Sequence, residues 1–172
     1  MRRARQRDRR FDVSVYLSVA PPDGFSKWGD AEWERWLREH PWESAERICS
    51  RGDWGIFLYQ LRQHSPKGRK AVEPVLESLV NERPLTSREA EDLRDALDVA
   101  RDEMDEKPAA AMKSANNFFA SPEDLEAMIA AARTRLGREP TLGEVWAEVF
   151  EQVHKVLESA VEKKRGIYFG NV

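Results

Sequence analysis

The second half of the chain contains three stretches with the apolar spacing of amphipathic helices, and each begins with a recognisable start signal. Two of these signals are capping boxes, TSRE at 86–89 and TLGE at 141–144, in which a hydroxyl and a carboxylate satisfy free backbone N–H groups. The third, SPED at 121–124, combines a cap, a first-turn proline and two acidic residues. The expected helices run from Thr86 to about Glu106, from Ser121 to Gly137, and from Thr141 as one helix to about Arg165.

The first half mixes strand and helix patterns. Apolar and polar residues alternate strictly over 11–19, which is typical of a half-buried strand. The apolar run 55–61 favours a buried strand, although a helical turn fits it too, and 167–169 favours a short strand near the C-terminus. Further helices are expected over 30–40, capped by Asp30, and over 42–50 and 69–81.

These elements predict an α+β fold that is predominantly helical. Five to six helices are expected to pack on a small sheet formed by the N-terminal strand, the 55–61 segment and the C-terminal strand. A chain of 172 residues corresponds to about one domain. We therefore expect a disordered basic tail over 1–10 and a single globular α+β domain over 11–172.

Charge is distributed unevenly along the chain. The first ten residues have a net charge of +5, whereas residues 11–172 have a net charge of −8. A run of like charges usually remains solvated and unfolded, but an arginine-rich arm also binds phosphate without sequence selectivity. The arm therefore forms the candidate nucleic-acid contact, with Arg2, Arg3, Arg5, Arg7, Arg9 and Arg10 as its residues.

Several classes of protein and site are not supported by the sequence. Phosphate-binding GxxxxGK and dinucleotide-binding GxGxxG motifs are absent, and His40, His64 and His154 form no metal-ligating spacing. The single cysteine, Cys49, excludes an internal disulfide and is expected to be a buried small apolar residue. The basic start is not followed by the apolar run of a signal peptide. We expect no metal, no cofactor, no membrane association and a cytoplasmic location.

Tryptophan is unusually frequent in one short region, where five of the six fall between Trp28 and Trp54. Such a cluster either fills a core beside a thin sheet or anchors a partner at the surface. The surface interpretation makes Trp28, Trp33 and Trp36 candidate partner-binding residues.

Carboxylates recur every three or four residues along the helix expected after Thr86. The row either forms a solvated helix face with local ion pairs, or it mimics the phosphate groups of nucleic acid and docks a basic partner. The docking interpretation makes these four carboxylates candidate partner-binding residues: Asp95, Asp98, Asp102 and Asp105.

A weakly patterned segment over 109–121 resembles the loops that carry function in other proteins. If the protein is an enzyme, the candidate pocket combines this segment with the region before the His64 loop, although linear spacing shows no nucleophile beside a base. The proposed pocket residues are Trp54, Tyr59, His64 and Asn117.

We expect a non-catalytic protein-binding domain. Its size and acidic body suit a bacterial immunity-type protein that neutralises a toxin, and the expected partner is then a basic protein. The first alternative is nucleic-acid association through the arginine-rich arm, which the acidic body opposes. The second alternative is a small enzyme that uses no cofactor.

Overall fold

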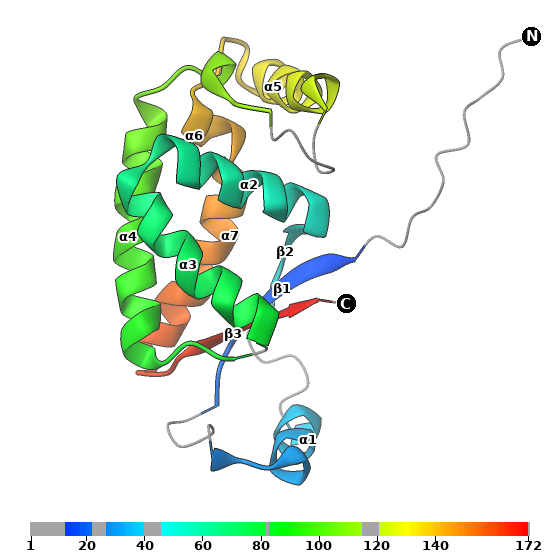
Figure 1. Cartoon of the computed structure of the whole chain (residues 1–172), viewed down its shortest axis with the longest axis vertical. Coiled ribbons are helices and arrows are strands. Elements are labelled where there is room, and N and C mark those ends of the chain that lie inside the picture. The colour runs from blue at the N-terminus through cyan, green and yellow to red at the C-terminus, as the bar shows by residue number, and fades with distance from the viewer. Residues whose placement is uncertain (1–12, 22–26, 40–45, 82, 115–120, 172) are drawn as a thin grey trace, which may run out of the picture.

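The computed structural model describes residues 13–21, 27–39, 46–81, 83–114 and 121–171. Within these residues, the chain forms seven α-helices and a three-stranded antiparallel sheet, which α2 (Arg51–His64), α3 (Pro66–Asn81) and α7 (Ala147–Glu162) contact (Figure 1). This arrangement confirms the predicted α+β class and its predominantly helical character.

The sheet has the strand order β2-β1-β3, with β1 (Ser14–Val19) between β2 (Glu46–Ser50) and β3 (Ile167–Asn171). Both neighbours run antiparallel to β1, and a register shift interrupts its pairing with β2 after Val15. The predicted strand is confirmed over 14–19, but the expected half-burial is wrong, because Ser14 and Ser18 are buried on one face as Val15 and Leu17 are on the other. Its expected first residues, 11 and 12, lie outside the described residues.

The third strand of the sheet differs from the prediction. Residues 55–61 lie in helix α2 (Arg51–His64), and β2 provides the strand where a helix over 42–50 was expected. The Ser50 hydroxyl accepts a hydrogen bond from the Asp53 N–H at 3.0 Å, which starts α2 immediately after β2. Because α2 is buried around most of its circumference, its sequence lacks the polar face that marks a surface helix.

Two long helices follow α2, namely α3 (Pro66–Asn81) and α4 (Ser87–Asp105). The predicted capping box before α4 is present, with Thr86 and Glu89 bonded to each other's backbone N–H groups. In Figure 1 the chain descends along α3 and returns upward along α4. The two helices therefore run in opposite directions and pack side by side.

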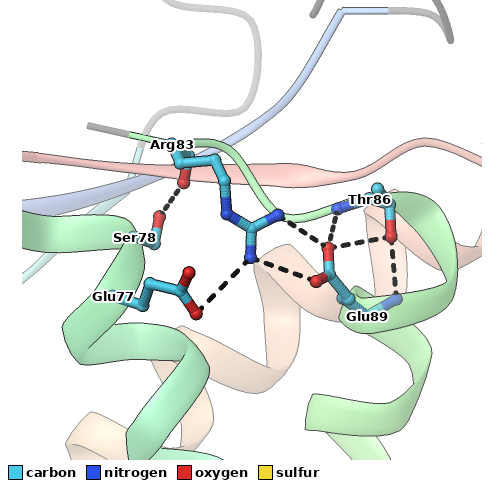
Figure 2. Close-up of polar contacts among 5 residues, drawn as sticks. All are labelled: Glu77, Ser78, Arg83, Thr86 and Glu89. Carbon is cyan, nitrogen blue, oxygen red and sulfur yellow. Dashed lines mark hydrogen bonds and ion pairs between the residues drawn. The ribbon is translucent and has the colours of Figure 1, made fainter. Parts of the chain in front are cut away.

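A clamp of polar side chains joins the end of α3 to the start of α4 (Figure 2). The Arg83 guanidinium donates to Glu89 at 3.1 Å and lies 3.9 Å from Glu77. The Ser78 hydroxyl donates to the Arg83 carbonyl, and the Thr86 N–H donates to Glu89 at 2.7 Å. These contacts fix the connector and hold the two helices at their junction.

The C-terminal region contains three helices, α5 (Pro122–Leu136), α6 (Leu142–Val145) and α7 (Ala147–Glu162). Helix α5 ends at Gly137 in the left-handed conformation, as predicted. The single long helix predicted after Thr141 is wrong, because Trp146 leaves helical geometry with φ −101° and ψ 9°. This break places the Trp146 ring in the core.

The core is one contiguous cluster that involves the sheet, α2, α4 and α7. The Phe57 ring lies 5.5 Å from Trp54, 5.5 Å from Trp146 and 5.1 Å from Phe150, measured between ring centroids. In contrast, helix α1 (Asp30–Glu39) stands apart from the helical body in Figure 1. No other described helix or strand makes extensive contact with it.

Candidate functional site

The four residues predicted to form a pocket do not all come together. Trp54, Tyr59 and His64 belong to α2, and Asn117 lies outside the described residues. Trp54 and His64 are separated by ten residues, which is about 15 Å along a helix. Trp54 instead packs against Phe169 of the sheet, with ring centroids 6.0 Å apart.

His64 is buried at the other end of α2. Its side chain is only 6% exposed, and its Nε2 atom has no hydrogen-bond partner among the described residues. Burial lowers the pKa of this imidazole, and the positive charges of Lys107 and Lys113 lower it further. The Lys107 ammonium donates to the His64 carbonyl at 2.6 Å. The imidazole is therefore held neutral beside two cations.

The polar groups next to His64 are used in joining helices. The Ser65 hydroxyl accepts from the Gly68 N–H at 2.7 Å, which caps α3, and donates to the Glu103 carboxylate. Gln60 is fully buried and bonds the backbone of Lys113 through both amide atoms, at 2.7 and 3.1 Å. Ser65 thus serves as a helix cap, with no hydrogen bond to the neighbouring imidazole.

Cys49 and potential metal ligands provide no reactive centre in the described part of the chain. Burial raises the pKa of the Cys49 thiol to about 12; Asp53 raises it further and Arg47 opposes the shift. The thiol is therefore protonated at neutral pH. Among residues 13–21, 27–39, 46–81, 83–114 and 121–171, no three His, Cys, Asp or Glu side chains are placed to hold a metal ion. None of the helices in these ranges is long and apolar enough to cross a membrane.

The tryptophans divide between core and surface. Trp54 is buried, whereas Trp28 and Trp36 are half-buried and form a ring pair with centroids 5.8 Å apart. The guanidinium of Arg165 stacks over the Trp36 ring at 5.0 Å and links α1 to the turn between α7 and β3. The side chain of Trp33 is not among those described. A hollow of about 370 Å³ beside this pair is lined by Trp28, Glu32, Arg35, Trp36 and Glu39.

The predicted row of carboxylates lies on the exposed side of α4. Asp95 contacts Arg94 at 2.8 Å, Asp98 contacts His154 Nδ1 at 3.1 Å, and Asp105 accepts from Thr141 Oγ1 at 2.9 Å. The Asp102 carboxylate forms no hydrogen bond or ion pair with the described residues. The four residues of this row, here called the acidic row, are all exposed: Asp95, Asp98, Asp102 and Asp105.

A surface groove runs between α3 and α4, next to the acidic row. Its volume is about 400 Å³, within the range of protein sites that receive ligand groups. Val99 is 41% exposed there, although an apolar side chain on a surface helix usually turns inward. Five residues of the lining are apolar: Ala71, Pro74, Leu93, Ala96 and Val99. Five are charged: Lys67, Lys70, Glu89, Asp92 and Asp95.

The charges on the rim of this α3–α4 groove differ in their local partners. Glu89 is held by Arg83 and the Thr86 backbone, and Asp95 is held by Arg94. By contrast, the Lys67 and Lys70 ammonium groups and the Asp92 carboxylate have no oppositely charged group within 4.0 Å among the described residues. The groove therefore combines an apolar floor with charges that no neighbour in the described chain neutralises.

The sequence interpretation identified one wall of this groove and missed the other. Asp95 was identified because exposed carboxylates on a helix repeat at a visible spacing, but Lys67 and Lys70 were not. A usable signal was the pair Ala96 and Val99, because both are apolar but lie outside the buried face of α4, which consists of Ala90, Leu93, Leu97, Ala100 and Met104. The arginine-rich residues 1–10 lie outside the described residues.

Comparisons with protein-family models, with curated proteins and with solved structures found no match to this chain. The groove and the acidic row are therefore interpreted from their own chemistry.

Proposed function

We propose that this protein is a non-catalytic protein-binding domain that docks its partner on the α3–α4 groove and the acidic row. The observation that carries this proposal is the open apolar groove of about 400 Å³ with unpaired charges on its rim. Apolar surface at the centre and charge at the edge is the usual composition of a protein interface. The exposed apolar side chains of the groove, Val99 among them, gain free energy when a partner's side chains remove them from water.

The carboxylates indicate the chemistry of the partner. Asp95 borders the groove, and Asp98, Asp102 and Asp105 continue the negative charge along the same helix. Such a row attracts a positively charged surface, speeds encounter and fixes orientation. A toxin that acts on nucleic acid needs a basic surface to hold phosphate, so an immunity-type role is the form of this proposal that we favour.

The reactive side chains support binding over catalysis. The Cys49 thiol is buried and protonated, and the Ser65 hydroxyl caps α3. His64 is enclosed beside Lys107, away from the open groove lining. These groups stabilise the fold around the groove and leave its surface to apolar and charged contacts.

Affinity capture followed by reconstitution tests the proposal. The full chain is immobilised, the retained proteins are identified, and the binding of each purified candidate is measured by calorimetry. We expect a basic protein that binds with one-to-one stoichiometry. The Asp95→Asn/Asp102→Asn double variant should weaken binding about five- to tenfold, because two charges of the acidic row are lost. Added salt should weaken binding of the wild type more than of this variant.

Matched variants separate a specific surface from a general charge effect. Glu123→Gln/Glu162→Gln removes two exposed carboxylates elsewhere and should leave the affinity unchanged. The proposal fails if no protein binds stoichiometrically or if both double variants weaken binding equally. Co-purification of nucleic acid that is lost after deletion of residues 1–10 would support the nucleic-acid alternative instead.

A further inference from the structure

We infer, on the basis of the proposed function, that the partner inserts an amphipathic α-helix into the α3–α4 groove. The cationic end of this helix lies beside Asp92 and Asp95, and its acidic end lies beside Lys67 and Lys70. The inference names the secondary structure, the charge order and the direction of the bound segment.

The composition of the walls favours a helix over an extended peptide. All ten lining residues belong to the two helices, whose backbone N–H and C=O groups bond within each helix. An extended segment would find almost no backbone partners there, whereas a helix satisfies its own backbone and presents only side chains. A third helix lying in the groove of a helix pair is also the ordinary packing of helical proteins.

One backbone group in the wall is an exception to this rule. Pro74 lies inside α3 and has no N–H to donate to the carbonyl of Lys70, four residues earlier. Both residues line the groove, so this carbonyl supplies an acceptor for a donor on the partner helix. A neutral donor on the bound segment, such as a tryptophan indole N–H, has the chemistry to use it without placing a second cation beside Lys70.

The length of the groove matches the spacing of helix anchors. On α4 the lining extends from Glu89 to Val99, which corresponds to about 15 Å along the axis. Apolar anchors at i, i+4 and i+7 span about 10.5 Å. The apolar floor therefore accommodates three such anchors, and the remaining length at each end is bordered by charge.

The direction follows from the placement of those charges. Lys67 and Lys70 lie in the first two turns of α3, and Asp92 lies in the second turn of α4. Because the two helices run in opposite directions, the lysines and Asp92 border opposite ends of the groove (Figure 1). The positive N-terminal end of a bound helix is favoured at Asp92, so this helix runs parallel to α4.

A pair of stapled peptides with the same composition tests this inference. Both carry leucines at i, i+4 and i+7; one has lysines in its N-terminal half and glutamates in its C-terminal half, and the other has the reverse order. Binding to the full chain is measured by fluorescence anisotropy. We expect the lysine-first peptide to bind about tenfold more tightly. The staple holds both peptides helical, so their difference reports the groove and not peptide folding.

Variants of the chain make the result specific to the groove. Lys67→Glu/Lys70→Glu reverses the charge at one end and should remove or invert the preference between the peptides. Val99→Lys should weaken binding of both, whereas Val80→Lys, on an exposed position of α3 outside the lining, should weaken neither. Circular dichroism of each variant verifies that it is folded.

The outcomes distinguish this inference from the proposed function. If a purified partner binds and Val99→Lys weakens it, but the two peptides bind equally or not at all, the inference is wrong and protein binding stands. If the lysine-first peptide is preferred but no protein partner exists, the groove recognises helices and the proposed function fails. Self-association of the chain that Val99→Lys abolishes would identify a second copy as the occupant and overturn the inference.

Discussion

Gly166 lies directly against the backbone carbonyl of Leu85, where β3 meets the connector between α3 and α4. The Leu85 N–H donates to the Ile167 carbonyl at 2.7 Å, and the Ile167 N–H donates to the Leu85 carbonyl at 3.2 Å. A β-carbon at position 166 would lie 2.9 Å from the Leu85 carbonyl carbon and closer still to its oxygen. The connector is thus attached to the edge of the sheet at a point that requires glycine.

Replacing this glycine tests how strongly the connector depends on the contact. Gly166→Ala should lower the free energy of unfolding by about 2–3 kcal/mol, because backbone on one side must move. Gly170→Ala, in the adjoining strand β3 but with no atom within 4 Å of the added carbon, should change stability little. Urea unfolding of both variants provides the measurement. Equal stability of the two alanine variants would contradict the contact.

The capping box in Figure 2 supports a second stability prediction. The Thr86 hydroxyl accepts from the Glu89 N–H at 3.2 Å, and Glu89 accepts from the Thr86 N–H at 2.7 Å. Thr86→Ala should lower stability by about 1 kcal/mol, whereas Thr86→Ser keeps the hydroxyl and should remain near the wild type. Thermal and urea unfolding should both rank the three proteins in this order. A serine variant as unstable as the alanine variant would exclude the cap as the cause.

Helix ends were predictable from sequence because their signals are local. The capping boxes at Thr86 and Thr141 and the glycine at 137 each act within a few residues of the chain. The break at Trp146 was not predictable in this way, because the apolar stripe continues across it from Val145 to Val149. The break depends on the space beside Phe57 that receives the Trp146 ring, which is a property of the assembled core.

Around Ser50 the sequence predicts a helix followed by a strand, whereas the structure has a strand followed by a helix. This error also arises because the conformation depends on the assembled core. The run Gly55–Leu61 is apolar because α2 is surrounded by other elements, and a buried helix and a buried strand leave similar sequences. The segment Glu46–Ser50 is short, and its strand conformation depends on pairing with β1, whose partner residues lie 29 to 36 positions earlier in the chain. Such pairing leaves no periodicity within the segment itself.

The candidate site was predictable only on α4. The acidic row is visible because one helix repeats carboxylates at its own period. The groove needs two helices side by side, so Lys67, Lys70 and Pro74 acquire their role only once α3 is placed against α4. Trp28 and Trp36 were expected either to fill the core or to anchor a partner at the surface, and their half-buried positions leave both interpretations open to test.

Burial of Cys49 predicts slow chemical modification in the folded protein. Burial raises the pKa of this thiol to about 12, so the thiol is protonated at neutral pH. The buried side chain is also out of reach of a reagent in solvent. A thiol reagent at pH 8 should react with the native chain far more slowly than with the chain unfolded in urea. The rate is followed by the absorbance of the released product. Equal rates in the two states would show that the segment around Cys49 opens readily.

His64 predicts a loss of stability in mild acid. Burial and the nearby charges of Lys107 and Lys113 hold its pKa below the usual 6.5, so the unfolded chain takes up this proton at a higher pH than the folded chain. The imidazole's contribution to stability is therefore complete above about pH 6.5 and declines as the pH falls below it. Between about pH 7 and pH 5, the free energy of unfolding should fall more steeply for the wild type than for His64→Gln. The other two histidines and all carboxylates are common to both proteins, so the difference between the curves isolates His64. Parallel curves would mean that the folded and unfolded chains bind this proton equally, which is incompatible with an imidazole enclosed beside two lysines.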